Sequence, residues 1–151
     1  MIEKGCFFIG HADAPSNILP SISDAAEELV CRFGVNQFFV GNHGNFDRLA
    51  QRALIELKSR YTNLQIILVT PYHPAVQTIK KPEYADEVLY PFEKTEMPQY
   101  AISKMNRKMI DECRFLIVYA DHVGKARDFL EYAVRREKKG KLYIQRIMRP
   151  K

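Results

Sequence analysis

The 151-residue sequence lacks the features that define several protein classes. No apolar run approaches the roughly 20 residues of a membrane-spanning helix, and no basic region followed by an apolar core opens the chain, so we expect neither a membrane span nor a signal peptide. It has no internal repeat. Its three cysteines (Cys6, Cys31 and Cys113) lack CxxC spacing, which predicts free buried thiols in a cytoplasmic protein. The 46% hydrophobic and 27% charged residues are typical of one globular domain spanning residues 1–151.

The positive charge of the chain is concentrated near its C-terminus. Residues 132–151 hold eight lysines and arginines and one glutamate, a net charge of +7, whereas the other 131 residues have a net charge of −2. A basic end such as 135–151 can bind nucleic acid or an acidic partner, although most basic ends are solvated helix faces and tails. A nucleic-acid-associated factor is therefore one alternative function.

Short apolar runs that suit buried strands alternate with amphipathic helical patterns. The predicted strands are 4–9, 36–40, 64–69, 114–120 and 141–147, with a further short strand at 87–90. The predicted helices are 22–33, 46–57 with Asn45 as N-cap, 100–112 and 125–139. Five prolines interrupt every pattern between 70 and 98, which predicts a long loop. This order predicts the α/β class, as a three-layer Rossmann-like sandwich with a largely parallel sheet of five or six strands.

All four histidines follow predicted strands. In open parallel sheets, ligands bind at the carboxyl ends of the strands, near the switch in strand order. His11, His43, His73 and His122 occupy the four loops at these ends, which predicts a polar cleft at one edge of the sheet. None has a metal-ligand spacing such as H-x-x-x-H, so we expect no metal site and no cofactor. The alternative is that individual loop histidines contact no ligand.

The segment G-N-H-G-N-F-D, residues 41–47, is a glycine-rich turn between a strand and a helix. Glycines here let backbone N–H groups approach a ligand, or simply form the turn. The segment is neither the G-x-G-x-x-G of dinucleotide-binding domains nor a P-loop. Asp47 would repel a phosphate and suits ribose hydroxyls, so we expect ribose or base at this loop. The candidate ligand-binding residues here and in the first strand loop are Gly10, His11, Gly41, Asn42, Gly44 and Asp47.

The start of the last predicted helix has the opposite charge. Gly124 precedes Lys125 and Arg127, and the helix dipole together with two cations suits an anion. Arg107, on the preceding helix, is expected at the same end of the sheet. We therefore place the phosphate of a nucleotide near Gly124, Lys125 and Arg107; the alternative is that these cations face solvent.

Five segments within residues 5–146 form a recognisable series: F-I-G-H, V-G-N-H-G-x-F-D, M-N-R-x-M-I-D, F-L-I-V-Y and L-E-Y-A. In order and spacing they resemble the SLOG superfamily, which includes the DNA-processing Smf proteins and the Lonely Guy phosphoribohydrolases. The resemblance is closest to the short, stand-alone bacterial members. It implies a Rossmann-like domain that binds a nucleotide or nucleotide-derived ligand. With the wide apolar face of the 100–112 helix (Ile102, Met105, Met109 and Ile110), it also predicts a homodimer.

The resemblance leaves the presence of catalysis open. Lonely Guy enzymes form their hydrolytic site from a helical arginine, a strand and P-G-G-x-G-T-x-x-E. Arg107 matches that arginine loosely, Gly124 is the one glycine left, and Glu131 matches a glutamate of the short members. A sensor or binding module is therefore the first hypothesis. The alternative is an N-glycosidic hydrolase of nucleoside monophosphates, with candidate catalytic residues Glu131, Asp47, Asp128 and Arg107 and with His11 or His43 to protonate the base.

Overall fold

The computed structural model describes residues 1–94 and 98–150, and within them it has six strands and four α-helices. The strands are β1 (Ile2–Gly10), β2 (Gln37–Val40), β3 (Gln65–Val69), β4 (Glu87–Leu89), β5 (Cys113–Tyr119) and β6 (Tyr143–Arg146). The helices are α1 (Leu19–Phe33), α2 (Asn45–Arg60), α3 (Ala101–Glu112) and α4 (Lys125–Lys138). No helix in these two ranges is long and apolar enough to cross a membrane.

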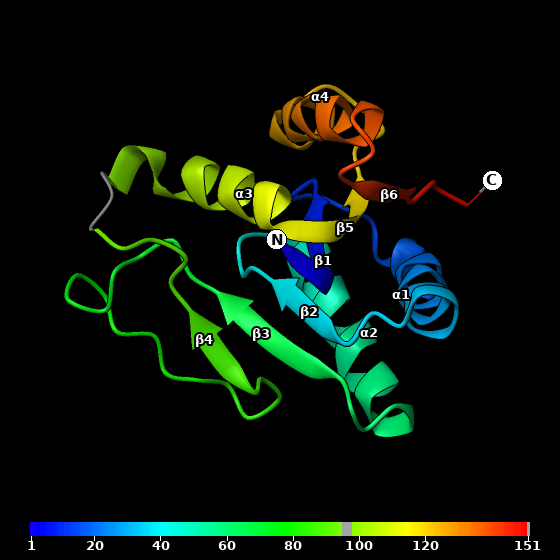
Figure 1. Ribbon diagram of the computed structural model, residues 1–151, viewed down its shortest axis with the longest axis horizontal. Helices are drawn as coiled ribbons and strands as arrows, with labels where there is room; N and C mark the ends of the chain where they lie inside the picture. Colours follow the sequence, from blue (N-terminus) through cyan, green and yellow to red (C-terminus); the bar gives the residue numbers. More distant parts are fainter. Residues whose placement is uncertain (95–97, 151) are drawn as a thin grey trace.

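All six strands are parallel, in the order β4-β3-β2-β1-β5-β6. The chain builds outward from β1 to β4, then returns to the other side of β1 to add β5 and β6 (Figure 1). The strand order therefore switches between β1 and β5, where ligands of open α/β sheets bind. The predicted parallel sheet is confirmed, and the apolar strand β5 lies inside it, between β1 and β6.

Helices cover both faces of the sheet (Figure 1). Successive strand residues point to opposite faces, so each strand contributes to two cores. Cys6 and Phe8 pack in one core with residues of α1 and α2. Phe7 and Ile9 pack in the other core with residues of α3 and α4. The predicted three-layer sandwich is confirmed.

The connection between β3 and β4, residues 70–86, contains no helix. Asp86 anchors its end, because the Asp86 backbone N–H donates to Ile66 O and the Asp86 carboxylate accepts the Ile66 N–H, both at 2.8 Å. Lys58 forms an ion pair with the same carboxylate. The predicted long loop and the short strand predicted within it, at 87–90, are confirmed for the described residues. Residues 95–97 of the predicted loop lie outside the described residues.

Gly10 lets α2 approach the end of β1. A Cβ atom on Gly10 would lie 2.1 Å from Cγ of Phe46, the second residue of α2. The Phe46 ring is buried and stacks on Tyr119, with ring centroids 6.3 Å apart. Because Phe46 precedes Asp47, this contact also fixes where Asp47 lies.

Helix α2 begins one residue earlier than the sequence indicates. Gly44 is its N-cap, with φ of 150°, and a Cβ on Gly44 would lie 2.7 Å from Cα of Ala12. Asn45 is the first helical residue, and its side chain donates to the backbone oxygen of Ala14 instead of capping the helix. The prediction of Asn45 as N-cap is therefore wrong, because the loop after β1 takes up its side chain.

The three cysteines are free, but only two of them are buried. Cys6 and Cys113 lie in β1 and β5, and burial raises the pKa of both thiols. Cys31 is exposed on α1, with its Sγ 3.3 Å from the Tyr61 hydroxyl oxygen. The expectation of buried thiols is wrong for Cys31, because this side of α1 faces away from the sheet.

Candidate functional site

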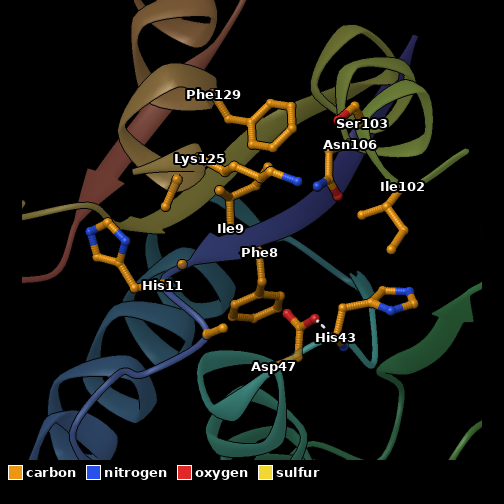
Figure 2. A pocket seen from close by; sticks show the side chains of 13 residues that line it. Phe8, Ile9, His11, His43, Asp47, Ile102, Ser103, Asn106, Lys125 and Phe129 are labelled. Atoms are coloured by element: carbon orange, nitrogen blue, oxygen red, sulfur yellow. Dashed lines mark hydrogen bonds between the residues drawn. The ribbon is translucent and has the colours of Figure 1, made fainter. Parts of the chain in front are cut away.

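A cavity of about 310 Å³ lies over the carboxyl end of β1, next to the switch in strand order (Figure 2). The end of β1 and its loop form one wall, the start of α2 with His43 forms another, and α3 and α4 close the remaining side. The site-facing side chains include His11, His43, Asp47, Ser103, Asn106, Lys125 and Phe129. The predicted polar cleft at this edge of the sheet is therefore present.

One side of the cavity is cationic. Lys125 is the first residue of α4, and its side chain extends across the cavity toward Asn106 (Figure 2). Ser103 lines the same side one turn earlier on α3. Within residues 1–94 and 98–150, these three side chains form no hydrogen bond or ion pair. An ammonium, an amide and a hydroxyl at the positive end of a helix dipole are thus available to an anion.

The opposite side of the cavity carries a weak acid. Asp47 Oδ2 accepts the backbone N–H of His43 at 2.9 Å. Burial raises the pKa of Asp47 to about 6, although the hydrogen bond from His43 acts to lower it. Burial also lowers the pKa of His43, so its imidazole is neutral near pH 7. Asp47 is therefore a proton donor or acceptor close to physiological pH, beside a neutral imidazole.

Two stacked imidazoles join the loops that follow β1 and β5. The rings of His11 and His122 lie 3.5 Å apart between centroids, at 17° to one another. Asp121 Oδ1 lies 2.6 Å from His122 Nδ1, which orients the His122 ring. The pKa of His11 is lowered mainly by burial and, to a smaller extent, by the neighbouring His122. We therefore assign His11 as neutral at pH 7.

The C-terminal residues hold the Asp121 carboxylate in place. The Tyr119 hydroxyl donates to Asp121 Oδ2 at 2.9 Å, and Arg149 Nε lies 2.8 Å from both that oxygen and the Tyr119 hydroxyl oxygen. Partial burial opposes ionisation of Asp121, but these bonds and the one from His122 keep its pKa below the usual value. Asp121 is thus charged and fully engaged.

His11, Asp121 and His122 bring three ligand atoms within 4.8 Å of one another. However, the lone pairs of two stacked imidazoles lie in nearly parallel planes, so they do not meet at one ion. Asp121 is also already bound by Tyr119 and Arg149. The arrangement suits a hydrogen-bonded support for the loops better than a metal centre.

A second hollow, of about 190 Å³, lies between α3 and α4. It shares Ser103, Lys125 and Phe129 with the main cavity, so the two hollows are continuous. Arg107 lies here, with its guanidinium carbon 5.8 Å from the centroid of the Tyr132 ring. Arg107 is thus beside the predicted phosphate position at Lys125, one hollow away from the main cavity.

A third hollow, of about 270 Å³, lies at the carboxyl ends of β2 and β3 and shares His43 with the main cavity. Asn42 lines this hollow, where its Oδ1 accepts a hydrogen bond from Gln51 at 3.4 Å. Gln51 also donates to the backbone oxygen of Gly41 at 2.8 Å. Asn42 therefore faces a neighbouring space, on the far side of His43 from β1.

The structure brings several predicted site residues together. Gly10, His11, Asp47 and Lys125 line the main cavity. Three predicted glycines support these residues without lining the cavity. A Cβ on Gly41 would lie 3.0 Å from Asp47 Oδ2, a Cβ on Gly124 would lie 3.6 Å from the His11 ring, and Gly44 caps α2.

Other predicted residues lie apart from the main cavity. Arg107 occupies the hollow between α3 and α4, together with Asp128. Glu131 is exposed on α4 and lines none of the three hollows. His73 packs against Tyr90, with ring centroids 5.2 Å apart, and also lines none of them.

The cavity residues that were not predicted from the sequence include Ser103, Asn106 and Phe129. Ser103 and Asn106 are one helical turn apart on α3, beside the buried Met105. Small polar residues at i and i+3 that border an apolar helix stripe are the signal that could have identified them. Phe129 looks in the sequence like any core residue of α4, and nothing separates it from Ala126 or Ala133.

Comparison with known proteins does not place the chain in a family. No protein-family model matches it. No curated protein matches it in sequence. The fold and the cavity therefore define its class: a Rossmann-like α/β domain with a polar cavity at the carboxyl ends of its central strands.

Proposed function

We propose that this domain binds a nucleotide or nucleotide-derived ligand in the main cavity. The observation that carries the proposal is the cavity at the switch between β1 and β5, with Lys125 on one side and Asp47 on the other. Its volume of about 310 Å³ lies within the range of small-molecule sites, roughly 300–1,000 Å³.

The phosphate of the ligand lies on the Lys125 side. An ammonium at a helix N-terminus attracts an anion through its own charge and through the backbone N–H groups of the first turn. Ser103 and Asn106 face the same space and can donate hydrogen bonds to phosphate oxygens. The side chains of Lys125, Ser103 and Asn106 have no hydrogen-bond or ion-pair partner among residues 1–94 and 98–150.

The ribose and base lie on the Asp47 side. A carboxylate accepts hydrogen bonds from ribose hydroxyls, and Asp47 is oriented for this by the backbone N–H of His43. The apolar side chain of Ile102, on the same side of the cavity as His43 (Figure 2), offers contact surface to a base or a sugar. The cavity thus presents opposite chemistry at its two sides, as a nucleoside phosphate requires.

We also propose that the chain is a member of the SLOG superfamily, of the short bacterial type. Three of the five segments that carry the resemblance supply cavity residues. F-I-G-H supplies Phe8 to His11, V-G-N-H-G-x-F-D supplies His43 and Asp47, and M-N-R-x-M-I-D supplies Asn106.

Two charge reversals on α4 test the phosphate position. Lys125→Glu should weaken binding of AMP or GMP by about 1–3 kcal/mol, because a charge-assisted hydrogen bond is replaced by repulsion. Lys138→Glu changes the net charge by the same amount, but Lys138 is exposed near the other end of α4. Because salt screens a charge at that distance, Lys138→Glu should weaken nucleotide binding by only a fraction of the effect of Lys125→Glu. Titration calorimetry measures both. Equal affinities for the two variants, or no binding of either nucleotide to the unmodified protein, would contradict the proposal.

A second candidate function is hydrolysis of the N-glycosidic bond of a nucleoside monophosphate. The observation that favours it is the pKa of Asp47, raised to about 6 by burial within the cavity. A carboxyl group with this pKa can deprotonate the attacking water or protonate the departing base near neutral pH. Release of free base from AMP or GMP, lost in Asp47→Asn, distinguishes this enzyme from a binding module.

The basic end gives less support to nucleic-acid binding than its composition indicates. Arg136 lies 3.6 Å from Asp111, Arg146 3.0 Å from Glu137 and Arg149 2.8 Å from Asp121, so three of its cations are paired within the chain. Lys151 lies outside the described residues.

The homodimer remains a prediction from the family resemblance. Met105, Met109 and Ile110, which make the predicted face of α3 wide, are each at most 1% exposed in the core of this chain. Ile102 is the member of that face that is exposed, at 38%. The apolar face of α3 is therefore largely used within the chain.

A further inference from the structure

We propose that the site is built for a nucleotide with at least two phosphates, the second of which is bound by Arg107 in the hollow between α3 and α4. This inference rests on the proposed function and deepens it, because it names the class of nucleotide. It depends on the continuity of two hollows, on the way Arg107 is held and on the charges that face it.

The two hollows are connected. The main cavity and the α3–α4 hollow have Ser103, Lys125 and Phe129 in common. A phosphate that contacts Lys125 therefore sits at the boundary between the two spaces. The next phosphate of a chain then enters the α3–α4 hollow, which at about 190 Å³ has room for it.

Arg107 contacts an aromatic ring. Its guanidinium carbon lies 5.8 Å from the centroid of the Tyr132 ring, a cation–π contact. Tyr132 is itself fixed, because its hydroxyl donates to Asp111 Oδ1 at 2.7 Å. Within the described ranges Arg107 has no carboxylate partner. Arg107 is an exposed residue with this one ring contact, so its guanidinium is accessible for a planar, bidentate contact with phosphate oxygens.

The side chains that line the α3–α4 hollow carry a net positive charge. Lys125 and Arg107 line it from two helices, and Asp128 is the one carboxylate among its lining residues. Two cations against one anion leave the hollow positive, which favours a phosphate. Asp128 opposes that phosphate, so removing its charge should strengthen binding of the second phosphate.

The test compares a monophosphate with a diphosphate of the same nucleoside by titration calorimetry. In the unmodified protein, ADP should bind about tenfold more tightly than AMP, or GDP than GMP, which is the effect of one charge-assisted contact. Arg107→Gln should reduce this ratio to about twofold or less, because it weakens binding of the diphosphate more than binding of the monophosphate. Asp128→Asn should increase the ratio.

Arg135→Gln is the matched control, because Arg135 is an exposed arginine of α4 outside the hollow. It removes the same charge and should leave the ratio of affinities unchanged, whereas an equal effect of Arg107→Gln and Arg135→Gln would overturn the inference. Thermal unfolding of each variant verifies that it is folded.

The outcomes separate this inference from the proposed function. If ADP and AMP bind equally and Lys125→Glu weakens both, the inference is wrong and the proposed function stands. If inorganic pyrophosphate binds as tightly as ADP, the hollow is a site for free pyrophosphate, and the nucleotide inference is wrong. If neither nucleotide pair binds, both proposals are wrong.

Discussion

The contact between Gly10 and Phe46 predicts a loss of stability when Gly10 gains a single methyl group. In Gly10→Ala, the new Cβ would lie 2.1–2.5 Å from three atoms of the Phe46 ring. The ring has little freedom to move, because Phe46 is 1% exposed and its ring contacts those of Tyr119 and Phe8. Relief of the overlap must therefore displace the start of α2.

The size of the effect follows from this geometry. Inserting a methyl group into a well-packed core typically costs 1–3 kcal/mol, and replacing glycine by alanine in a strand returns about 0.5–1 kcal/mol. Because the new methyl overlaps three ring atoms at 2.1–2.5 Å, the upper end of the first range applies, which leaves a net loss of about 2 kcal/mol in the free energy of unfolding. With an unfolding entropy of about 2.1 cal/mol/K per residue, this lowers the Tm of the 151-residue chain by about 6 °C.

Urea unfolding of four proteins measures this effect: the unmodified chain, Gly10→Ala, Phe46→Ala and the double variant. In the Phe46→Ala background the ring is gone, so the added methyl should cost less than about 0.5 kcal/mol, or stabilise the protein by filling part of the space. If Gly10→Ala costs the same in both backgrounds, the proposed overlap with Phe46 is not the cause.

Two further predictions concern pH and local stability. Burial raises the pKa of Asp47 from 3.8 to about 6, so the folded protein binds this proton more tightly than the unfolded chain, and its stabilising effect is lost as the pH rises from about 4 to 6. Between these two pH values, the free energy of unfolding measured in urea should fall by about 2 kcal/mol less in Asp47→Asn than in the unmodified protein. Parallel pH profiles of the two proteins would contradict this prediction. Hydrogen exchange should be slowest at 115–119 of the interior strand β5 and faster at the edge strand β4; the reverse order would contradict the packing argument.

Most of the fold could be predicted because the strands carry their own signal. The apolar runs at 5–9 and 114–120 have no polar face, so each had to be buried on both sides, as β1 and β5 are. The helix at 46–57 repeats apolar residues at helical spacing, and α2 buries all of them except Ile55, which is exposed. The first turn of α2 was misplaced because the contact of Asn45 with Ala14 links residues 31 positions apart.

The candidate site was predicted only in outline. The rule for open parallel sheets identified the correct edge, and so located His11, Asp47 and Lys125. The stacking of His11 on His122 depends on two loops 111 positions apart in the sequence, which no local pattern describes. The rotation of α3 about its axis decides that Asn106 faces the cavity and Arg107 the neighbouring hollow. That rotation is set by packing, which spacing alone does not determine.

The bond of Arg149 to Asp121 affects how the basic end can be studied. Deleting residues 135–151 to remove positive charge would also delete β6 and the arginine that steadies Asp121 and, through it, His122. If such a deletion abolished binding, the experiment would not separate the loss of positive charge from the loss of β6 and Arg149. Neutralising the exposed Lys138, Lys139 and Lys141 by substitution keeps the strand and the arginine in place.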